Sequence, residues 1–234
     1  MKDRAKAFVG ALTAGANLGA DADLGLDGEG VHNPGAEGVH DLPVSHPVRD
    51  SETVFAGRIW DIVADVVALP SGQEVRREYM RHPGAAAVIA LNAAGQVLLQ
   101  RQYRHPVRAE LFEPPAGLLD EVGEPVIEAA KRELAEEADL MAGDWRHLLT
   151  FNSTPGGTDE VIHVFLARDL AEVPAAERHE RVDEEADLVP VWLDLDQACA
   201  LVMSGALRSP TAVVGLLAAV RARDTAGFDA LPPS

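Results

Sequence analysis

The chain has 234 residues, of which 47% are hydrophobic and 5% aromatic, so one core built mainly of aliphatic side chains is expected. Its formal net charge of −18 excludes a general nucleic-acid-binding surface, because a phosphate backbone is bound by clustered Lys and Arg. An anionic substrate would therefore need metal ions, although surface acidity also serves solubility alone.

The compartment is predicted from cysteine content and from hydropathy. The single cysteine, Cys199, cannot form an internal disulfide and lies in an apolar run at residues 198–202, which predicts a buried side chain. No run of about eighteen apolar residues and no signal-peptide pattern is found. A cytoplasmic protein is expected.

The N-terminal part of the chain divides into two regions of different character. Residues 1–50 are rich in Gly, Ala, Asp and His without a sustained period, which is typical of a flexible extension. Residues 53–68 are β-branched and apolar, and a Pro-Ser-Gly turn at 70–72 leads into residues 74–79. This pattern predicts an N-terminal hairpin or small sheet.

The remaining elements alternate between strands and helices. A turn at residues 92–95 separates two predicted strands at 85–91 and 96–102. The other predictions are strands at 147–151, 161–167 and 189–193, and helices at 196–204 and 210–223. Because no βαβ repeat or Gly-rich dinucleotide fingerprint is present, these elements predict a mixed sheet flanked by helices.

Residues 117–140, GLLDEVGEPVIEAAKRELAEEADL, carry the chemistry. A glycine-rich acidic loop runs into a helix with Pro125 in its first turn. The apolar positions of this helix recur at spacings of three and four: Ile127, Ala130, Leu134, Ala138 and Met141. The acidic face consists of Glu133, Glu136 and Glu137.

These three glutamates have two explanations. Carboxylates at positions i, i+3 and i+4 repel one another, and a divalent cation such as Mg²⁺ or Mn²⁺ would turn repulsion into binding. Arg132 precedes Glu136 by four residues and can fix its carboxylate for such a role. The glutamates alone favour the other explanation, an exposed helix with a solvated acidic face, which is what most Glu-rich helices are.

The surrounding pattern decides between them. Gly117, Glu124 and the run from Arg132 to Glu137 together resemble the Nudix box, whose pattern is Gly, five residues, Glu, seven residues, then Arg-Glu-apolar-any-Glu-Glu-any-Gly-apolar. Two departures are present: six residues separate Gly117 from Glu124, and Asp139 replaces the last glycine. Asp adopts the left-handed conformation more readily than most residues, so the helix end should be preserved.

The resemblance implies an α/β/α sandwich around a mixed sheet and hydrolysis of a nucleoside diphosphate linked to another group. It further implies that Glu133 and Glu137 are the principal metal ligands, with the carbonyl of Ala116 as an additional one. Glu136, which assists the metal, and Arg132 are also implied in catalysis. The expected metal is Mg²⁺, with Mn²⁺ as an alternative.

Further segments are similar to the ADP-ribose pyrophosphatase branch of that family, and the similarity extends over residues 53–226. They include Arg101-Gln102-Tyr103-Arg104, residues 113–117, residues 154–160, and Pro155, sixteen positions after Asp139. The similarity implies substrate contacts, listed here: Arg76, Glu78, Arg104, Glu160 and Trp60, although an aromatic in a strand is often a core residue. The general base is expected on a late loop, as Glu185 or alternatively Glu184.

The resulting hypothesis is an Mg²⁺-dependent enzyme that converts ADP-ribose to AMP and ribose 5-phosphate. The expected parts of the chain are a flexible extension at residues 1–50, a catalytic domain at 51–228 and a tail at 229–234. Within the catalytic domain, the strands at 51–82 are expected to take part in a homodimer, and residues 83–228 to form the core. The alternatives are another nucleotide sugar or dinucleotide as substrate, such as GDP-mannose or NADH, and an ADP-ribose sensor without catalysis. His82, His105 and His163 lack the spacing of a zinc site and are expected to be structural or rim residues. No nucleic-acid or membrane partner is expected.

Overall fold

The computed structural model describes residues 40–181 and 186–234. Every element described below lies within residues 46–234, which form one compact unit. The predicted domain boundary near residue 50 stays a prediction.

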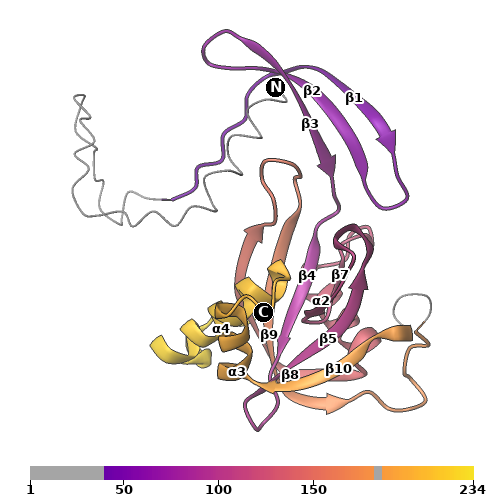
Figure 1. Cartoon of the computed structure of the whole chain (residues 1–234), viewed down its shortest axis with the longest axis vertical. Coiled ribbons are helices and arrows are strands. Elements are labelled where there is room, and N and C mark those ends of the chain that lie inside the picture. Colours follow the sequence, from indigo (N-terminus) through magenta and orange to yellow (C-terminus); the bar gives the residue numbers. More distant parts are fainter. Residues whose placement is uncertain (1–39, 182–185) are drawn as a thin grey trace, which may run out of the picture. The chain divides into compact units, whose positions relative to one another are not determined.

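The N-terminal strands form a three-stranded antiparallel sheet in the order β1-β2-β3 (Figure 1). Its strands are β1 (Val48–Ala56), β2 (Asp61–Ala68) and β3 (Glu74–Arg81). The predicted turn joins β2 to β3, with Gly72 at φ 83°. The polar start of β1 carries no strand pattern, and β1 is exposed along its whole length. The small sheet predicted here is confirmed, with β1 as a further strand.

The central sheet has the strand order β7-β4-β9-β8. Its strands are β4 (Ala85–Ala90), β7 (Ala116–Leu118), β8 (Leu140–Asn152) and β9 (Val161–Glu172). β4 and β9 are parallel, whereas the β4–β7 and β8–β9 pairs are antiparallel. The predicted mixed sheet is therefore confirmed.

A second sheet, in the order β10-β5-β6, lies beside the central one. It consists of β5 (Gln96–Arg104), β6 (Ala109–Glu113) and β10 (Val189–Asp194), with a short 3-10 helix, η2 (His105–Val107), between β5 and β6. The strands predicted at 96–102 and 189–193 are confirmed. β6 and β7 are too short to show a period of their own.

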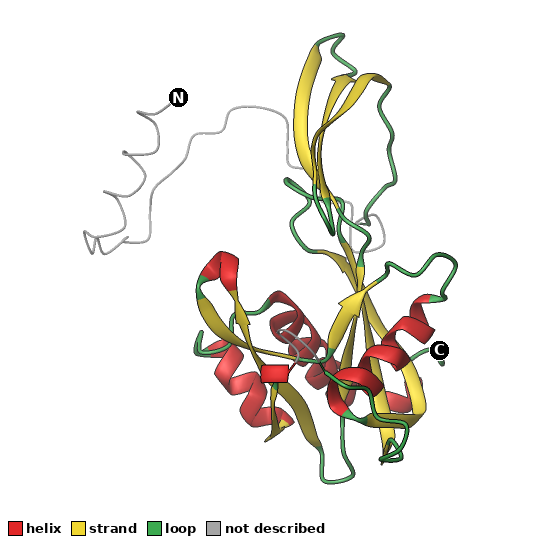
Figure 2. Ribbon diagram, turned by 90° about the vertical axis from the view of Figure 1, so that its right-hand side faces the viewer, coloured by secondary structure: helices red, strands yellow, loops and turns green. Residues whose placement is uncertain are grey.

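Helices cover both faces of the central sheet, as Figures 1 and 2 show. Side chains alternate along β4, so Ile89 packs into one hydrophobic cluster and Val88 into the other. The first cluster includes residues of α3 (Leu195–Met203) and α4 (Pro210–Thr225), and the second includes residues of α2 (Val126–Ala138). This is the α/β/α arrangement implied by the sequence.

Helices α3 and α4 confirm the predicted helices at 196–204 and 210–223. Cys199 on α3 is partly buried rather than fully buried as predicted, because the neighbouring Ala198 is the residue that enters the core. Within the described part of the chain, none of the helices has the length and apolar character needed to cross a membrane.

Two neighbouring leucines on α4 provide a test of this core. Leu216 is fully buried, whereas Leu217 is 37% exposed. We expect Leu216→Ala to lower the free energy of unfolding by about 2 to 5 kcal/mol, because it leaves a cavity between α4 and the sheet. Leu217→Ala should cost less than about 1 kcal/mol, since Ala is also the better helix former. Chemical denaturation measures both, and equal losses would contradict the packing described.

Candidate active site

Helix α2 holds the acidic run Glu133, Glu136 and Glu137 beside the central sheet. Pro125 is the N-cap and the helix begins at Val126, so the proline lies one position before the first helical residue. The buried face is formed by Ala129, Ala130 and Leu134, together with Glu133. The predicted apolar face was wrong at Met141, which lies in β8 and is 45% exposed, because the helix ends two residues earlier.

Asp139 ends the helix in the left-handed conformation, with φ 55° and ψ 34°. Its backbone N–H donates to the carbonyl of Ala135 at 3.1 Å. The prediction that aspartate replaces the glycine without loss of the helix end is confirmed.

The longer loop between Gly117 and Glu124 closes on itself in a turn. The N–H of Glu124 donates to the carbonyl of Glu121 at 3.1 Å, and Gly123 lies in this turn at φ 85°. The turn accommodates the one residue by which this loop is longer than the Nudix pattern, so the Glu124 side chain still contacts α2. The carboxylate of Glu124 accepts two hydrogen bonds from Arg132, of 3.2 Å from Nε and 3.1 Å from Nη2.

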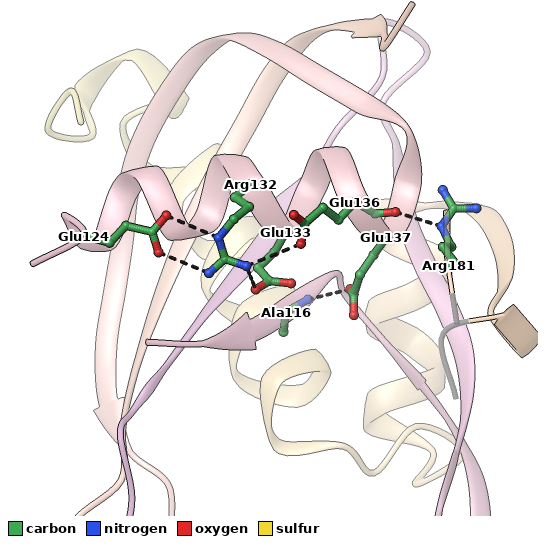
Figure 3. A network of polar contacts seen from close by, with 7 residues as sticks. All are labelled: Ala116, Glu124, Arg132, Glu133, Glu136, Glu137 and Arg181. Carbon is green, nitrogen blue, oxygen red and sulfur yellow. Dashed lines mark hydrogen bonds and ion pairs between the residues drawn. The ribbon is translucent and has the colours of Figure 1, made fainter. Parts of the chain in front are cut away.

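Arg132 is the centre of a polar network along α2 (Figure 3). Besides Glu124, its guanidinium contacts Glu133 at 2.5 Å and Glu136 at 3.4 Å. Hydrogen bonding to Glu124 raises the pKa of Arg132 above its ordinary value against the opposing effect of burial, and Glu133 adds to the rise. Arg132 therefore stays charged and fixes the directions of these carboxylates.

Strand β7 brings the backbone against the acidic face of α2. The N–H of Ala116 donates to Oε2 of Glu137 at 3.0 Å. A Cβ atom at Gly117 would lie 1.9 Å from Cδ of Glu133. Only glycine therefore permits this close approach, which places the Glu133 carboxylate beside the strand, with Glu133 just 8% exposed.

These groups fit a divalent cation that prefers hard oxygen ligands. Glu133 and Glu137 extend from the helix toward β7 and Glu136 lies beside Arg132, and the space that a side chain at Gly117 would fill is occupied by the Glu133 carboxylate. In the described parts of the chain, no group of three or more His, Cys, Asp or Glu side chains is gathered closely enough to hold a metal ion by itself. The side-chain oxygens of Glu133 and Glu137 are nevertheless of the kind that hard divalent cations bind.

A cavity of about 400 Å³ lies beside Ala116 and Gly117. Three residues predicted to contact substrate line it: Trp60, Arg104 and Glu160. A volume of several hundred Å³ is typical of a small-molecule site. The structure therefore places a predicted substrate pocket next to the carboxylates of α2.

Several cavity residues were not predicted from the sequence: Glu113, Ser153 and Ser209. Glu113 accepts two hydrogen bonds from Arg104 through Oε2, of 3.0 and 2.6 Å. Ser153 donates to Glu160. Glu113 and Ser153 each contact a predicted residue across a short connection, β5–β6 and β8–β9 respectively, whereas Ser209 hydrogen-bonds to Thr211.

His82 also lines this cavity, which agrees with its predicted place among structural or rim residues. The N–H of Gly84 donates to its Nδ1 at 3.1 Å, and Oε1 of Glu160 lies 3.5 Å from the same nitrogen. His105, by contrast, belongs to η2 and contacts Tyr103.

Two groups of predicted residues do not meet at this cavity. Arg76 and Glu78 lie on β3, where Arg76 contacts Glu78 at 2.9 Å and Glu52 at 2.6 Å, and neither lines the cavity. The two candidate bases, Glu184 and Glu185, lie outside the described residues.

Gly117 offers a direct test of the site. We expect Gly117→Ala to weaken Mn²⁺ binding by at least about 10- to 100-fold, because the added methyl group displaces the Glu133 carboxylate. Gly156→Ala is the matched control, since its Cβ would meet no atom within 4 Å. Mn²⁺ titration followed by electron paramagnetic resonance measures binding, and circular dichroism checks folding. Unchanged Mn²⁺ binding in folded Gly117→Ala protein would refute this geometry.

Known proteins resemble this chain in sequence and in fold. The chain is 40% identical over 168 residues to an ADP-ribose pyrophosphatase of Mycobacterium tuberculosis, covering 72% of this chain and 80% of that protein. It is 35% identical over 153 residues to an ADP-ribose pyrophosphatase of Bacillus subtilis, covering 65% and 80% respectively. A solved ADP compounds hydrolase shares the fold, with a TM-score of 0.63 and 23% identity over 79% of this chain and 97% of that one. Residues 80–211 match the NUDIX domain model, so the chain belongs to the Nudix family of pyrophosphohydrolases.

Proposed function

We propose that this enzyme hydrolyses the pyrophosphate bond of ADP-ribose to AMP and ribose 5-phosphate, with Mg²⁺ as its metal. The observation that carries the proposal is the cavity beside the box glutamates, lined by Trp60, Arg104 and Glu160. The names of the relatives from M. tuberculosis and B. subtilis support the same substrate.

The proposed roles on α2 follow from the contacts there. Glu133 and Glu137 bind the metal, and Glu136 assists them, while Arg132 keeps Glu133 and Glu136 in position. The carbonyl of Ala116 is an additional proposed ligand, and its N–H orients Glu137. When bound, Mg²⁺ neutralises charge on the phosphate oxygens and lowers the barrier to attack by water.

The cavity supplies the groups for substrate binding. Glu113 holds Arg104 through two N–H groups, and the remaining N–H groups of the guanidinium are suited to phosphate. Trp60 is 40% exposed and offers a face on which adenine can stack. Glu160, held by Ser153, can accept hydrogen bonds from ribose hydroxyls.

The attacking water needs a general base within hydrogen-bond reach. Glu185 is the proposed base, and Glu184 the alternative, because both precede β10 in the acidic run at residues 183–187. Support for this assignment comes from the resemblance to the ADP-ribose pyrophosphatase branch.

A homodimer is proposed in which the N-terminal strands of one subunit complete the pocket of the other. Arg76 and Glu78 would contact substrate there, although neither lines the cavity of its own subunit. Large apolar side chains exposed at the end of β1 and in the turn to β2 support a self-contact: Val54, Phe55 and Ile59 are each more than half exposed. The cytoplasm is the proposed compartment, which cell fractionation tests.

Substrate and site are tested together by a hydrolysis assay. With Mg²⁺, we expect AMP release from ADP-ribose to exceed turnover of NADH and GDP-mannose, and a chelator to abolish it. Glu137→Gln should lower kcat by at least about 100-fold, because a bound metal ion contributes several kcal/mol and each 1.36 kcal/mol is tenfold in rate.

Glu128→Gln is the matched control on the same helix. Glu128 is in the first turn of α2 and pairs with Lys131 at 2.9 Å, away from the box carboxylates. Its replacement should leave kcat unchanged. Faster turnover of GDP-mannose or NADH would show that the enzyme prefers that substrate to ADP-ribose. Binding of ADP-ribose without turnover would favour the alternative of a non-catalytic ADP-ribose sensor.

The oligomer is tested by light scattering after size exclusion. We expect a dimer for the whole chain and for a chain shortened to residues 46–234, which should also keep its activity. Combining Phe55→Asp with Ile59→Asp should give monomers, because charges would be buried at the contact. A dimer that survives both changes would place the interface elsewhere, and loss of activity in the folded shortened chain would refute the domain boundary.

A further inference from the structure

The last turn of α2 carries Glu136 and Glu137, and its backbone carbonyls point beyond the helix. The last four carbonyls of any α-helix lack partners within it. Here the carbonyl of Glu136 accepts a hydrogen bond of 2.8 Å from Nε of Arg181. The carbonyl of Glu137 accepts one of 2.7 Å from Nε2 of Gln100. Side chains from outside the helix therefore hold the backbone of both glutamates.

Arg181 makes a second contact at the same helix end. Its Nη2 lies 2.6 Å from Oδ2 of Asp139, the residue that replaces the last glycine of the box. A single guanidinium thus joins the Glu136 carbonyl to the residue that ends the helix, as Figure 3 shows for Glu136. Glycine at position 139 would allow the same backbone conformation but offer no carboxylate.

Charge explains why the pair is favourable. The C-terminal end of a helix carries partial negative charge, so the carboxylate of Asp139 alone would be unfavourable there. Arg181 offsets that carboxylate and the carbonyls together. Asp139 and Arg181 are largely shielded from solvent, at 24% and 27% side-chain exposure, and Gln100 is 3% exposed.

We propose that Arg181, held by Asp139, is a positioning residue that fixes the last turn of α2 and thereby the metal-binding carboxylates of Glu136 and Glu137. This inference rests on the proposed function for the identity of the reaction, but its effect on metal binding is measurable without turnover. Arg181 acts through the helix backbone, in contrast to Arg132, which contacts the carboxylates themselves.

The experiment compares Arg181→Met with Arg178→Met. Arg178 comes from the same segment, but its guanidinium contacts Glu172 at 2.8 Å and the carbonyl of Val173 at 3.1 Å, and among the described residues it makes no hydrogen bond or ion pair to α2. Mn²⁺ affinity is measured by electron paramagnetic resonance, kcat and KM are measured with ADP-ribose and Mg²⁺, and thermal unfolding is recorded for each protein.

For Arg181→Met, we expect Mn²⁺ affinity and kcat each to fall by about tenfold, the size of effect typical of a residue that orients a metal ligand. KM should change by less than about twofold, because the cavity is untouched. Arg178→Met should match the wild type in Mn²⁺ affinity and kcat. Arg181→Lys and Asp139→Asn should give intermediate values, because each retains part of the contact.

The inference would be overturned if Arg181→Met kept the Mn²⁺ affinity and kcat of the wild type and only its unfolding temperature fell. The ion pair between Arg181 and Asp139 would then be purely structural. An equal fall in Arg178→Met would also overturn it. Failure of the wild type to hydrolyse ADP-ribose would instead refute the proposed function, since the comparison of Mn²⁺ affinities does not depend on that substrate.

Discussion

The contact between the Glu133 carboxylate and the backbone of β7 at Gly117 is the constraint on which the active site depends. It requires a residue without a side chain at position 117, because a Cβ there would overlap the carboxylate at 1.9 Å from Cδ. It also requires that a cation accompany the carboxylate, which Arg132 provides at 2.5 Å. Burying a carboxylate without such a partner would be costly.

The layers of the fold explain how this contact is held in place. β4 lies between β7 and β9 in the central sheet, and α2 packs on one face through Ala129, Ala130 and Leu134. Small residues on that face let the helix approach the sheet closely. The helices on the opposite face bury the other side of the same strands. The apolar core therefore holds the body of α2 against the sheet.

Much of this arrangement was predictable because it is local in sequence. Periodicity located the central strands and the helices, and the box placed Glu124, Arg132, Glu133 and Glu137 together. The short strands β6 and β7 and the exposed strand β1 have no apolar period, so the sequence did not predict them. Met141 was predicted on the apolar face of the helix because the spacing of apolar residues continues beyond the residue that ends the helix.

The partners of the site were less predictable, for a different physical reason. Glu113 with Arg104, and Ser153 with Glu160, lie only nine and seven residues apart, but they meet only when the β5–β6 and β8–β9 connections bring their strands together. Gln100 gave one usable signal, since a glutamine at the end of the apolar run Val97–Leu99 must find a hydrogen-bond partner when buried. Arg181 gave none.

The replacement at position 139 shows how a departure from a motif can be compensated. The conformation needs a residue tolerant of positive φ, and aspartate meets that need as glycine does, though less freely. The carboxylate that aspartate adds lies at the negative end of the helix, where it requires a cation. Arg181 supplies that cation and also binds the carbonyl of Glu136. Glycine at position 139 would therefore preserve the backbone conformation but remove the anion that holds Arg181. Asp139 and Arg181 thus depend on each other at this end of the helix.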